Sequence, residues 1–225
     1  MVDTTEQAGV VPHLGRQEAE RWQHHYLGPE HLLLGLLRHG DDPVGHGDNP
    51  AARLLRAKGL DLETVRAEVD RLIAQGVLPG PQPSDAELLA TLGIDLEAVE
   101  RRLKETFGWQ AYYDAAQRVR LRPTHAVPHA PLAGTPLVCW RALRFACDEA
   151  VARGQELGPE HLLLGLLRDA QDPLGTGLYP QDRRLRGLLG LPDHGPHPIK
   201  LLVEARGLTL ERLRAAVLNE LDTNR

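Results

Sequence analysis

Apolar and polar positions follow a helical pattern along most of this 225-residue chain. The most apolar stretch is Leu27–Arg38, in which five of the six positions from 32 to 37 are leucine. Leucines at such closely spaced positions cover more than one face of a helix, which predicts a helix buried in the fold. Pro29 suits the first turn of that helix, where a missing backbone N–H costs nothing, and Glu30 suits the positive end of the helix dipole.

This stretch is part of an internal repeat. The twelve residues recur without a change at Leu157–Arg168, 130 positions later. The segment ending at Glu63 also resembles the one ending at Glu211, now at a shift of 148 positions. The second copy therefore holds about eighteen extra residues near 181–198, whose Gly, Pro and His content predicts a loop insertion. A partial third copy, Leu88–Glu97, matches only the back half of the unit.

Helix ends and helix contacts can be placed within these copies. Asp61, Asp95 and Thr209 each follow a Gly-x pair, which predicts that they are the N-caps of amphipathic helices. Gly35 and Gly165 stand in the middle of the leucine-rich helices, where glycine costs about 1 kcal/mol relative to alanine. Glycine at this place in both copies predicts a close contact with another helix.

Composition also divides the chain. Two Pro/Gly-rich breaks at 77–84 and 122–134 separate a first repeat unit at 1–78, a linker with an additional helical segment at 79–134, and a second repeat unit at 135–225. No strand pattern of useful length appears. We therefore predict an all-α fold, in which the two helical repeats pack as a pseudo-twofold bundle with an extra helical segment between them.

The repeated sequence G-P-E-H-L-L-L-G-L-L-R, followed later by G-L-x-L-E, resembles the repeat of Clp ATPase N-terminal domains, those of the ClpC type most closely. The resemblance implies a module that binds substrates and adaptors and is not an enzyme. It implies as partners a peptide or protein substrate, a phosphoarginine-marked protein, a Clp-targeting cyclic peptide, and a Clp unfoldase or protease. The chain would then be an adaptor or decoy in Clp-dependent proteolysis. No G-x-x-x-x-G-K-[ST] phosphate loop occurs, so we expect a stand-alone domain without ATPase activity or cofactors.

The same resemblance supplies candidate ligand-binding residues. In ClpC N-domains the glutamate of the repeated motif binds phosphoarginine, which implies this role for Glu30 and Glu160, with His31 and His161 beside them. A carboxylate pairs well with a guanidinium, and N–H groups at a helix start suit a phosphate. The alternative is structural: glutamate in a first turn stabilises the helix dipole, and the histidines bond locally.

Charge and rare residues limit other classes of function. A formal net charge of −5 and a pI near 6.1 argue against nucleic-acid binding. Ser84 is the only serine, and the eleven histidines include no H-E-x-x-H motif, so neither a serine hydrolase nor a metal site is expected. Two cysteines, Cys139 and Cys147, fit a reducing compartment, and no apolar run is long enough for a membrane, so a cytoplasmic location is expected. A DNA-contacting regulator and a small metal-using enzyme remain the alternatives.

Overall fold

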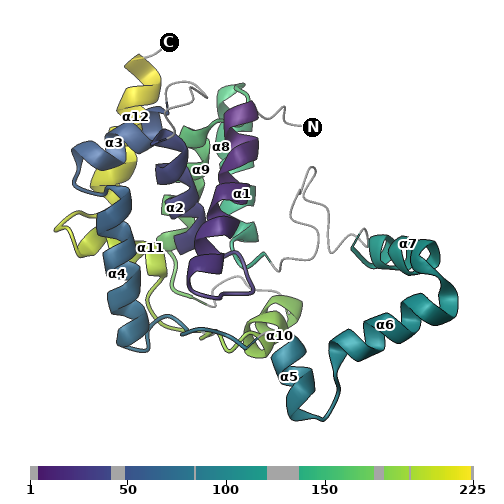
Figure 1. The fold of residues 1–225 in the computed structure, drawn as a ribbon. Coiled ribbons are helices and arrows are strands. Elements are labelled where there is room, and N and C mark those ends of the chain that lie inside the picture. Colours follow the sequence, from purple (N-terminus) through teal and green to yellow (C-terminus); the bar gives the residue numbers. More distant parts are fainter. Residues whose placement is uncertain are drawn as a thin grey trace. The chain divides into compact units, whose positions relative to one another are not determined.

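The structure of the chain is a computed structural model (Figure 1). It describes residues 5–41, 49–83, 85–120, 137–174, 180–192 and 194–223. Within these ranges the chain forms helices and no strand, which confirms the predicted all-α class. None of the described helices is long and apolar enough to cross a membrane. The helices are α1 (Glu6–Arg21), α2 (Pro29–Gly40), α3 (Pro50–Ala57), α4 (Leu62–Ala74), α5 (Asp85–Thr91), α6 (Leu96–Phe107), α7 (Trp109–Arg120), α8 (Trp140–Arg153), α9 (Pro159–Ala170), α10 (Pro180–Leu188), α11 (Pro198–Glu204) and α12 (Leu210–Thr223).

The contacts divide the chain into two compact units. The first combines Met1–Gly80 with Pro136–Arg225, and therefore holds both full copies of the repeat. The second is Pro81–Thr135, with α5, α6 and α7. The interruption between the two halves of the first unit falls near the breaks at 77–84 and 122–134, of which 122–134 and Ser84 lie outside the described residues.

The first unit has a pseudo-twofold arrangement. Each repeat opens with a helix pair, α1 on α2 and α8 on α9, and these helices lie side by side in Figure 1. The third helix of each repeat contacts its own repeat and also reaches the other one: α3 contacts α9 and α12, whereas α11 contacts α2 and α4. Because the exchange is reciprocal, the leucine faces of the two repeats are buried against each other, as predicted.

The mid-helix glycines lie where helices approach most closely. A Cβ atom on Gly35 would meet the carbonyl oxygen of Val11 and, at 2.5 Å, the backbone nitrogen of Gly15. A Cβ on Gly165 would likewise meet the backbone of Ala142 and Ala146. The close contact predicted from the repeated glycines is therefore confirmed in both helix pairs.

A buried carboxylate ties together three helices of each repeat. Glu18 of α1 is 2% exposed and binds the guanidinium groups of Arg38 of α2 and Arg66 of α4, at 3.2 and 2.7 Å. Glu149 of α8 has the same role in the second repeat, where its ion pairs are with Arg153, Arg168 and Arg214. These networks hold α4 and α12 against the helix pair of their own repeat.

The predicted helix starts are confirmed at their caps. The side chain of Asp61 accepts a hydrogen bond from the Thr64 N–H at 2.8 Å, and Thr209 does the same for Arg212 at 3.2 Å. The preceding glycines, Gly59 and Gly207, have φ values of +77° and +67°, which suit the glycine that ends a helix.

Replacing Asp61 by alanine is expected to lower the free energy of unfolding by about 1 kcal/mol, because the first turn of α4 loses the acceptor for one N–H. Asp61→Asn keeps an acceptor and should stay within a few tenths of a kcal/mol of the wild type. Urea denaturation followed by circular dichroism measures both variants. An equal loss in the two would show that the negative charge, and not the cap, carries the effect.

The insertion near 181–198 differs from the prediction. The sequence favoured a loop, whereas the structure contains helix α10 within it. Leu174 N–H donates to the Gly195 carbonyl at 3.0 Å and closes the base of the segment. Arg186 of α10 is 7% exposed and donates to the Pro192 carbonyl, so α10 is held against the chain that follows it. Pro180 begins the helix and Gly187 lies in its last turn, so neither residue interrupts it.

The second unit contains the partial third copy. Its helix α6 begins at the predicted cap, where Asp95 accepts from the Ala98 N–H at 3.0 Å. Val99 and Leu103 occupy the positions of Val65 and Val69 of α4 but are 42% and 40% exposed, while their counterparts are buried. The third copy thus keeps the hairpin of the repeat without the buried face.

Candidate functional site

The G-P-E-H sequence builds the same corner at the start of α2 and of α9. The N–H of Gly28 donates to Nδ1 of His31 at 3.0 Å, which caps the helix from its third residue. The carboxylate of Glu30 folds back over Gly28, where a Cβ atom would lie 2.7 Å from Oε2. The second corner repeats this geometry with Gly158 and His161 at 3.1 Å. The geometry therefore explains why glycine, glutamate and histidine stand at these positions of the G-P-E-H sequence.

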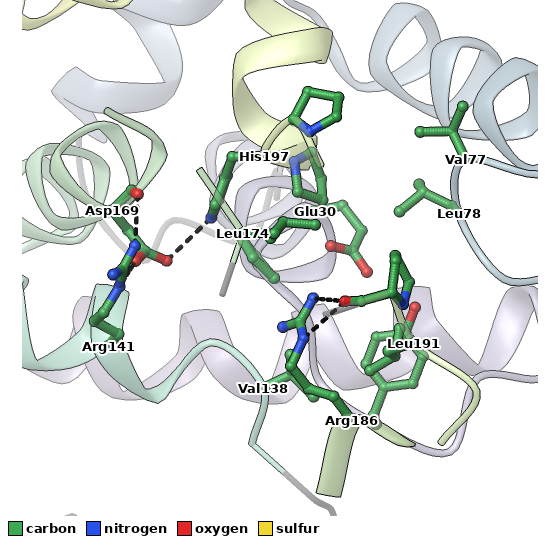
Figure 2. A pocket seen from close by; sticks show the side chains of 15 residues that line it. Glu30, Val77, Leu78, Val138, Arg141, Asp169, Leu174, Arg186, Leu191 and His197 are labelled. Atoms are coloured by element: carbon green, nitrogen blue, oxygen red, sulfur yellow. Dashed lines mark hydrogen bonds and ion pairs between the residues drawn. The ribbon is translucent and has the colours of Figure 1, made fainter. Parts of the chain in front are cut away.

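The first corner faces a pocket of about 620 Å³, counting space open to solvent. Glu30 forms one wall, Pro198 at the start of α11 another, and Val77 and Leu78 beyond α4 a third (Figure 2). Further lining comes from Leu174 and the insertion, by Arg186, Leu191, Pro192, Pro196 and His197. Glu30 itself is 1% exposed, and its Oε1 has no hydrogen-bond partner among the described residues.

The second corner faces a smaller hollow of about 230 Å³, again counting space open to solvent. Glu160 lies opposite Pro50 at the start of α3 and opposite Val217 and Leu221 of α12. These elements are the pseudo-twofold counterparts of α11 and α4 in the first pocket. The side chain of Glu160 is 19% exposed, compared with 2% for Glu30. A second carboxylate, Glu220, also lines this pocket.

Burial controls the protonation of both corners. It raises the pKa of Glu30 and that of Glu160 above the usual range, because a charged carboxylate loses its hydration. It lowers the pKa of His31 to about 3 and that of His161 to about 4 for the same reason. A cationic ligand placed at either glutamate would reverse the shift of the carboxyl group and favour its charged form.

A chain of hydrogen bonds runs from the first corner to the end of the first repeat. Because Gly28 N–H donates to Nδ1 of His31, the proton of that imidazole lies on Nε2, which is 3.0 Å from Nδ1 of His24. Nε2 of His24 then donates to the Pro79 carbonyl at 2.9 Å. Burial lowers the pKa of His24 to about 4, with His31 adding to the shift. Both histidines are therefore neutral. Their pairing was not predicted from the sequence, because His24 lies outside the repeated motif.

The geometry of this cluster raises the question of a metal. Ligand atoms of His24, Glu30 and His31 all lie within 4.8 Å of one another. The imidazole lone pairs, however, already accept hydrogen bonds from Gly28 and from His31. Since a metal needs an unprotonated nitrogen with a free lone pair, the cluster in this arrangement does not suit one.

The second repeat contains a buried triad of Asp169, Arg141 and His197, which has a structural role. Asp169 binds Arg141 and also accepts from Nε2 of His197 at 3.1 Å. Nδ1 of His197 accepts from the Ile199 N–H at 3.3 Å and caps α11. Both ring nitrogens are therefore engaged, so the triad stabilises the start of α11. The triad was not predicted from the sequence, because its three residues lie in separate segments and His197 falls within the predicted loop insertion.

The four candidate ligand residues are thus brought together in pairs. Glu30 and His31 lie at the first corner, and Glu160 and His161 lie at the second. The histidines are fixed as helix caps and are almost fully buried, at 0% and 1% exposure. Of the four, Glu160 is the side chain that reaches solvent to a useful extent, so its ligand role stays a proposal with the best geometric support. Of the eleven histidines in the sequence, His46, His125 and His129 lie outside the described residues.

The part of the chain that contains the first corner is similar to a known family of domains. Residues 3–88 match the Clp repeat (R) N-terminal domain, and the resemblance stated from the repeated motif is confirmed. Residues 3–88 of the chain are therefore similar to a Clp N-terminal repeat domain. A region of 217 residues, 93% of the chain, is 26% identical to the Negative regulator of genetic competence ClpC/MecB of Bacillus subtilis (strain 168), of which it covers 20%.

Further proteins are similar to parts of the chain. A stretch of 72 residues, 32% of the chain, is 46% identical to a Probable ATP-dependent Clp protease ATP-binding subunit of Chlamydia pneumoniae, and 168 residues, 74% of the chain, are 29% identical to the Chaperone protein ClpC1, chloroplastic, of Arabidopsis thaliana. The chain covers 8% and 12% of these two proteins. The N-terminal domain of ClpD from Arabidopsis thaliana matches 97% of the chain and is itself covered to 94%, at 16% identity and a TM-score of 0.43.

Proposed function

We propose that this chain is a non-catalytic binding module that captures a peptide or protein segment through an arginine side chain at the Glu160 pocket. The observation that carries the proposal is a carboxylate that is partly open to solvent and desolvated enough for its pKa to be raised, next to an apolar wall. Such a site gains a charge-assisted bond when a guanidinium arrives.

The walls of the pocket suit the rest of an arginine side chain. Pro50, Ala51, Leu54, Val217 and Leu221 supply apolar surface for its three methylene groups. Glu220 adds a second carboxylate, although its Oε1 is already 2.6 Å from Arg53. Glu160 has no ion pair with lysine or arginine among the described residues. The uncompensated charge at this pocket is therefore that of Glu160.

The same geometry favours unmodified arginine over phosphoarginine as the ligand. Pro159 has no N–H, and the N–H of Glu160 is engaged by its own carboxylate. The first turn of α9 therefore presents few donors to a phosphate, and two carboxylates repel it. We expect unmodified arginine to bind better than phosphoarginine. The Clp-targeting cyclic peptide is a third ligand to compare with them. Within a Clp system this module would act as an adaptor or as a decoy for such ligands.

Glu160→Gln is expected to weaken binding of a blocked arginine-containing peptide about ten- to a hundredfold, because a hydrogen bond to a charged group is worth about 1.5–3 kcal/mol. Isothermal titration calorimetry with the peptide, its phosphoarginine form, its lysine analogue and the cyclic peptide ranks the ligands. Failure of all four to bind at sub-millimolar concentration would overturn the proposal.

The matched control is Glu211→Gln. Glu211 also lies in the first turn of a helix, α12, and is exposed, but it does not line the pocket. If glutamate acted only on the helix dipole, both variants would lose a similar 0.3–1 kcal/mol of stability and keep the same affinity. A loss of affinity confined to Glu160→Gln separates the ligand role from the structural one.

A further inference from the structure

The second unit presents an apolar face that it does not cover itself. Burial is described for residues 81–83, 87 and 89–115 of this unit, and none of these side chains is buried. Six large apolar side chains on α6, on α7 and directly before α6 are 40% to 65% exposed, namely Ile94, Val99, Leu103, Phe107, Trp109 and Tyr113. These six residues are called the α6–α7 face below.

The residues of this face lie on adjoining sides of the two helices. Val99, Leu103 and Phe107 are spaced four positions apart, so they share one side of α6. Lys104 lies next to this side, and its Nζ is 5.0 Å from the centre of the Trp109 ring. The aromatic start of α7 therefore continues the apolar side of α6.

The same positions are buried in both full copies of the repeat. Leu103 corresponds to Val69 of α4 and to Val217 of α12, which are 0% and 1% exposed. In those copies α4 packs on α2 and α12 packs on α9. The partial third copy matches only the back half of the repeat and has no such helix pair of its own. Its apolar residues therefore need a cover from elsewhere.

A second copy of the chain is the cover that the surface of the molecule favours. Among the described residues of the first unit, Val151 is the one large apolar side chain that is exposed, so this unit offers no comparable apolar face. A second copy offers an identical face, and a twofold dimer places the same patch on both sides of its interface. Residues 81–135 hold seven Asp and Glu against six Lys and Arg, a net charge of −1, so two such units repel each other little.

The size of the face also suits a dimer. At about 200 Å² for an aromatic side chain and about 100 Å² for an aliphatic one, the exposed fractions correspond to about 500 Å² of apolar surface in each chain. Exposed apolar patches of this extent often mark interaction sites. Two chains together would bury about 1,000 Å² before any polar rim is counted, which is enough for a specific interface.

We propose that the α6–α7 face is a dimerisation surface, on which the second units of two copies of this chain pack about a twofold axis. No residue of this face lines either glutamate pocket, so the inference is independent of the proposed peptide site. The partial third copy then has a role different from that of the full copies: they build the first unit, and it joins two chains.

Sedimentation velocity of the full chain tests the proposal. The wild type is expected to sediment at micromolar concentration with twice the mass of one 24.8 kDa chain. Leu103→Glu should raise the dissociation constant of the dimer by about a hundredfold or more and leave a monomer, because each interface would bury two unpaired charges in place of two leucines. Phe107→Ser is a second variant that should weaken the dimer without adding a charge.

The matched control is Arg101→Glu, which also places a glutamate on α6. Arg101 is exposed, and two residues of helix put it on the side opposite Leu103, so this variant should remain a dimer. Circular dichroism checks the helix content of each variant. Calorimetry with the blocked arginine peptide should give the same affinity for the wild type and for Leu103→Glu, so the dimer and the peptide site are read separately.

Three results would overturn the proposal. A wild type that stays monomeric up to about 100 μM would exclude a specific dimer, and loss of stability of this monomer in Leu103→Glu would mean that the chain covers its own face. A dimer that survives both Leu103→Glu and Phe107→Ser would have its interface elsewhere. A dimer lost equally in Arg101→Glu would depend on charge and not on the apolar face.

Discussion

Lowering the pH from 7.5 to 5 is expected to remove about 2 kcal/mol of the stability that the first unit gains from keeping His31 neutral. His31 has a pKa of about 3 in the folded chain and about 6.5 in the unfolded one, so the unfolded state binds more protons in this range. The stabilisation from keeping His31 neutral is complete above pH 6.5 and falls by about 1.4 kcal/mol for each unit below it, down to pH 3. His31 alone therefore contributes about 2 kcal/mol between pH 7.5 and 5.

Two more histidines act in the same direction. The pKa of His24 and that of His161 are each lowered to about 4, so their stabilisation is also lost as the pH falls below 6.5. Glu30 and Glu160 act in the opposite sense, because their raised pKa values favour the folded state at lower pH. The histidines and the carboxyl groups therefore oppose each other, and the contribution of His31 is isolated by comparing the wild type with a variant that lacks it.

Urea denaturation at pH 7.5 and pH 5, at constant ionic strength, measures this dependence. His31→Gln keeps an acceptor at the third position of the helix, as in an ordinary capping box, and removes the titrating group. Its loss of stability between the two pH values should be about 2 kcal/mol smaller than that of the wild type. The same loss in both proteins would mean that the pairing of His24 and His31 does not control the response to acid.

The second large effect is expected from Gly35→Ala. The new Cβ would collide with the backbone of α1 at Val11 and Gly15, and a backbone cannot move aside as a flexible side chain does. We expect a net loss of about 2–3 kcal/mol, because overpacking of this kind outweighs the gain of about 1 kcal/mol from the better helix propensity of alanine. Thermal and urea denaturation give the value.

Gly9→Ala is the matched control for this substitution. Gly9 lies in α1 with no atom within 4 Å of the position of its Cβ, so the same change should be neutral or should stabilise the chain by up to about 1 kcal/mol. Equal stability of the two variants would contradict the close helix contact. Gly165→Ala should behave like Gly35→Ala, since the second repeat has the same contact against Ala142 and Ala146.

Features that depend on local chemistry were predictable from single residues. Asp61 and Thr209 cap their helices as expected, because a side-chain acceptor followed by an amphipathic run has one favourable use. The glycines at 35 and 165 were informative because two copies kept a residue that weakens a helix. The helix within the insertion was not predicted, since its Gly and Pro content suggested a loop and the contacts of Arg186 and Leu191 that hold it are tertiary.

The sequence by itself determined that this chain is all-helical, that it contains two copies of one repeat, the first of which resembles a Clp N-terminal repeat, and that Glu30 and Glu160 stand at equivalent helix starts. These are consequences of periodicity and duplication, which are properties of the chain in one dimension. The tertiary structure decided which of the two glutamates meets solvent, how His24 and His31 share their protons, and where Arg186 lies. Access, protonation and charge pairing depend on which distant segments pack together, and Glu30 and Glu160 differ in these respects although the twelve residues around them are identical.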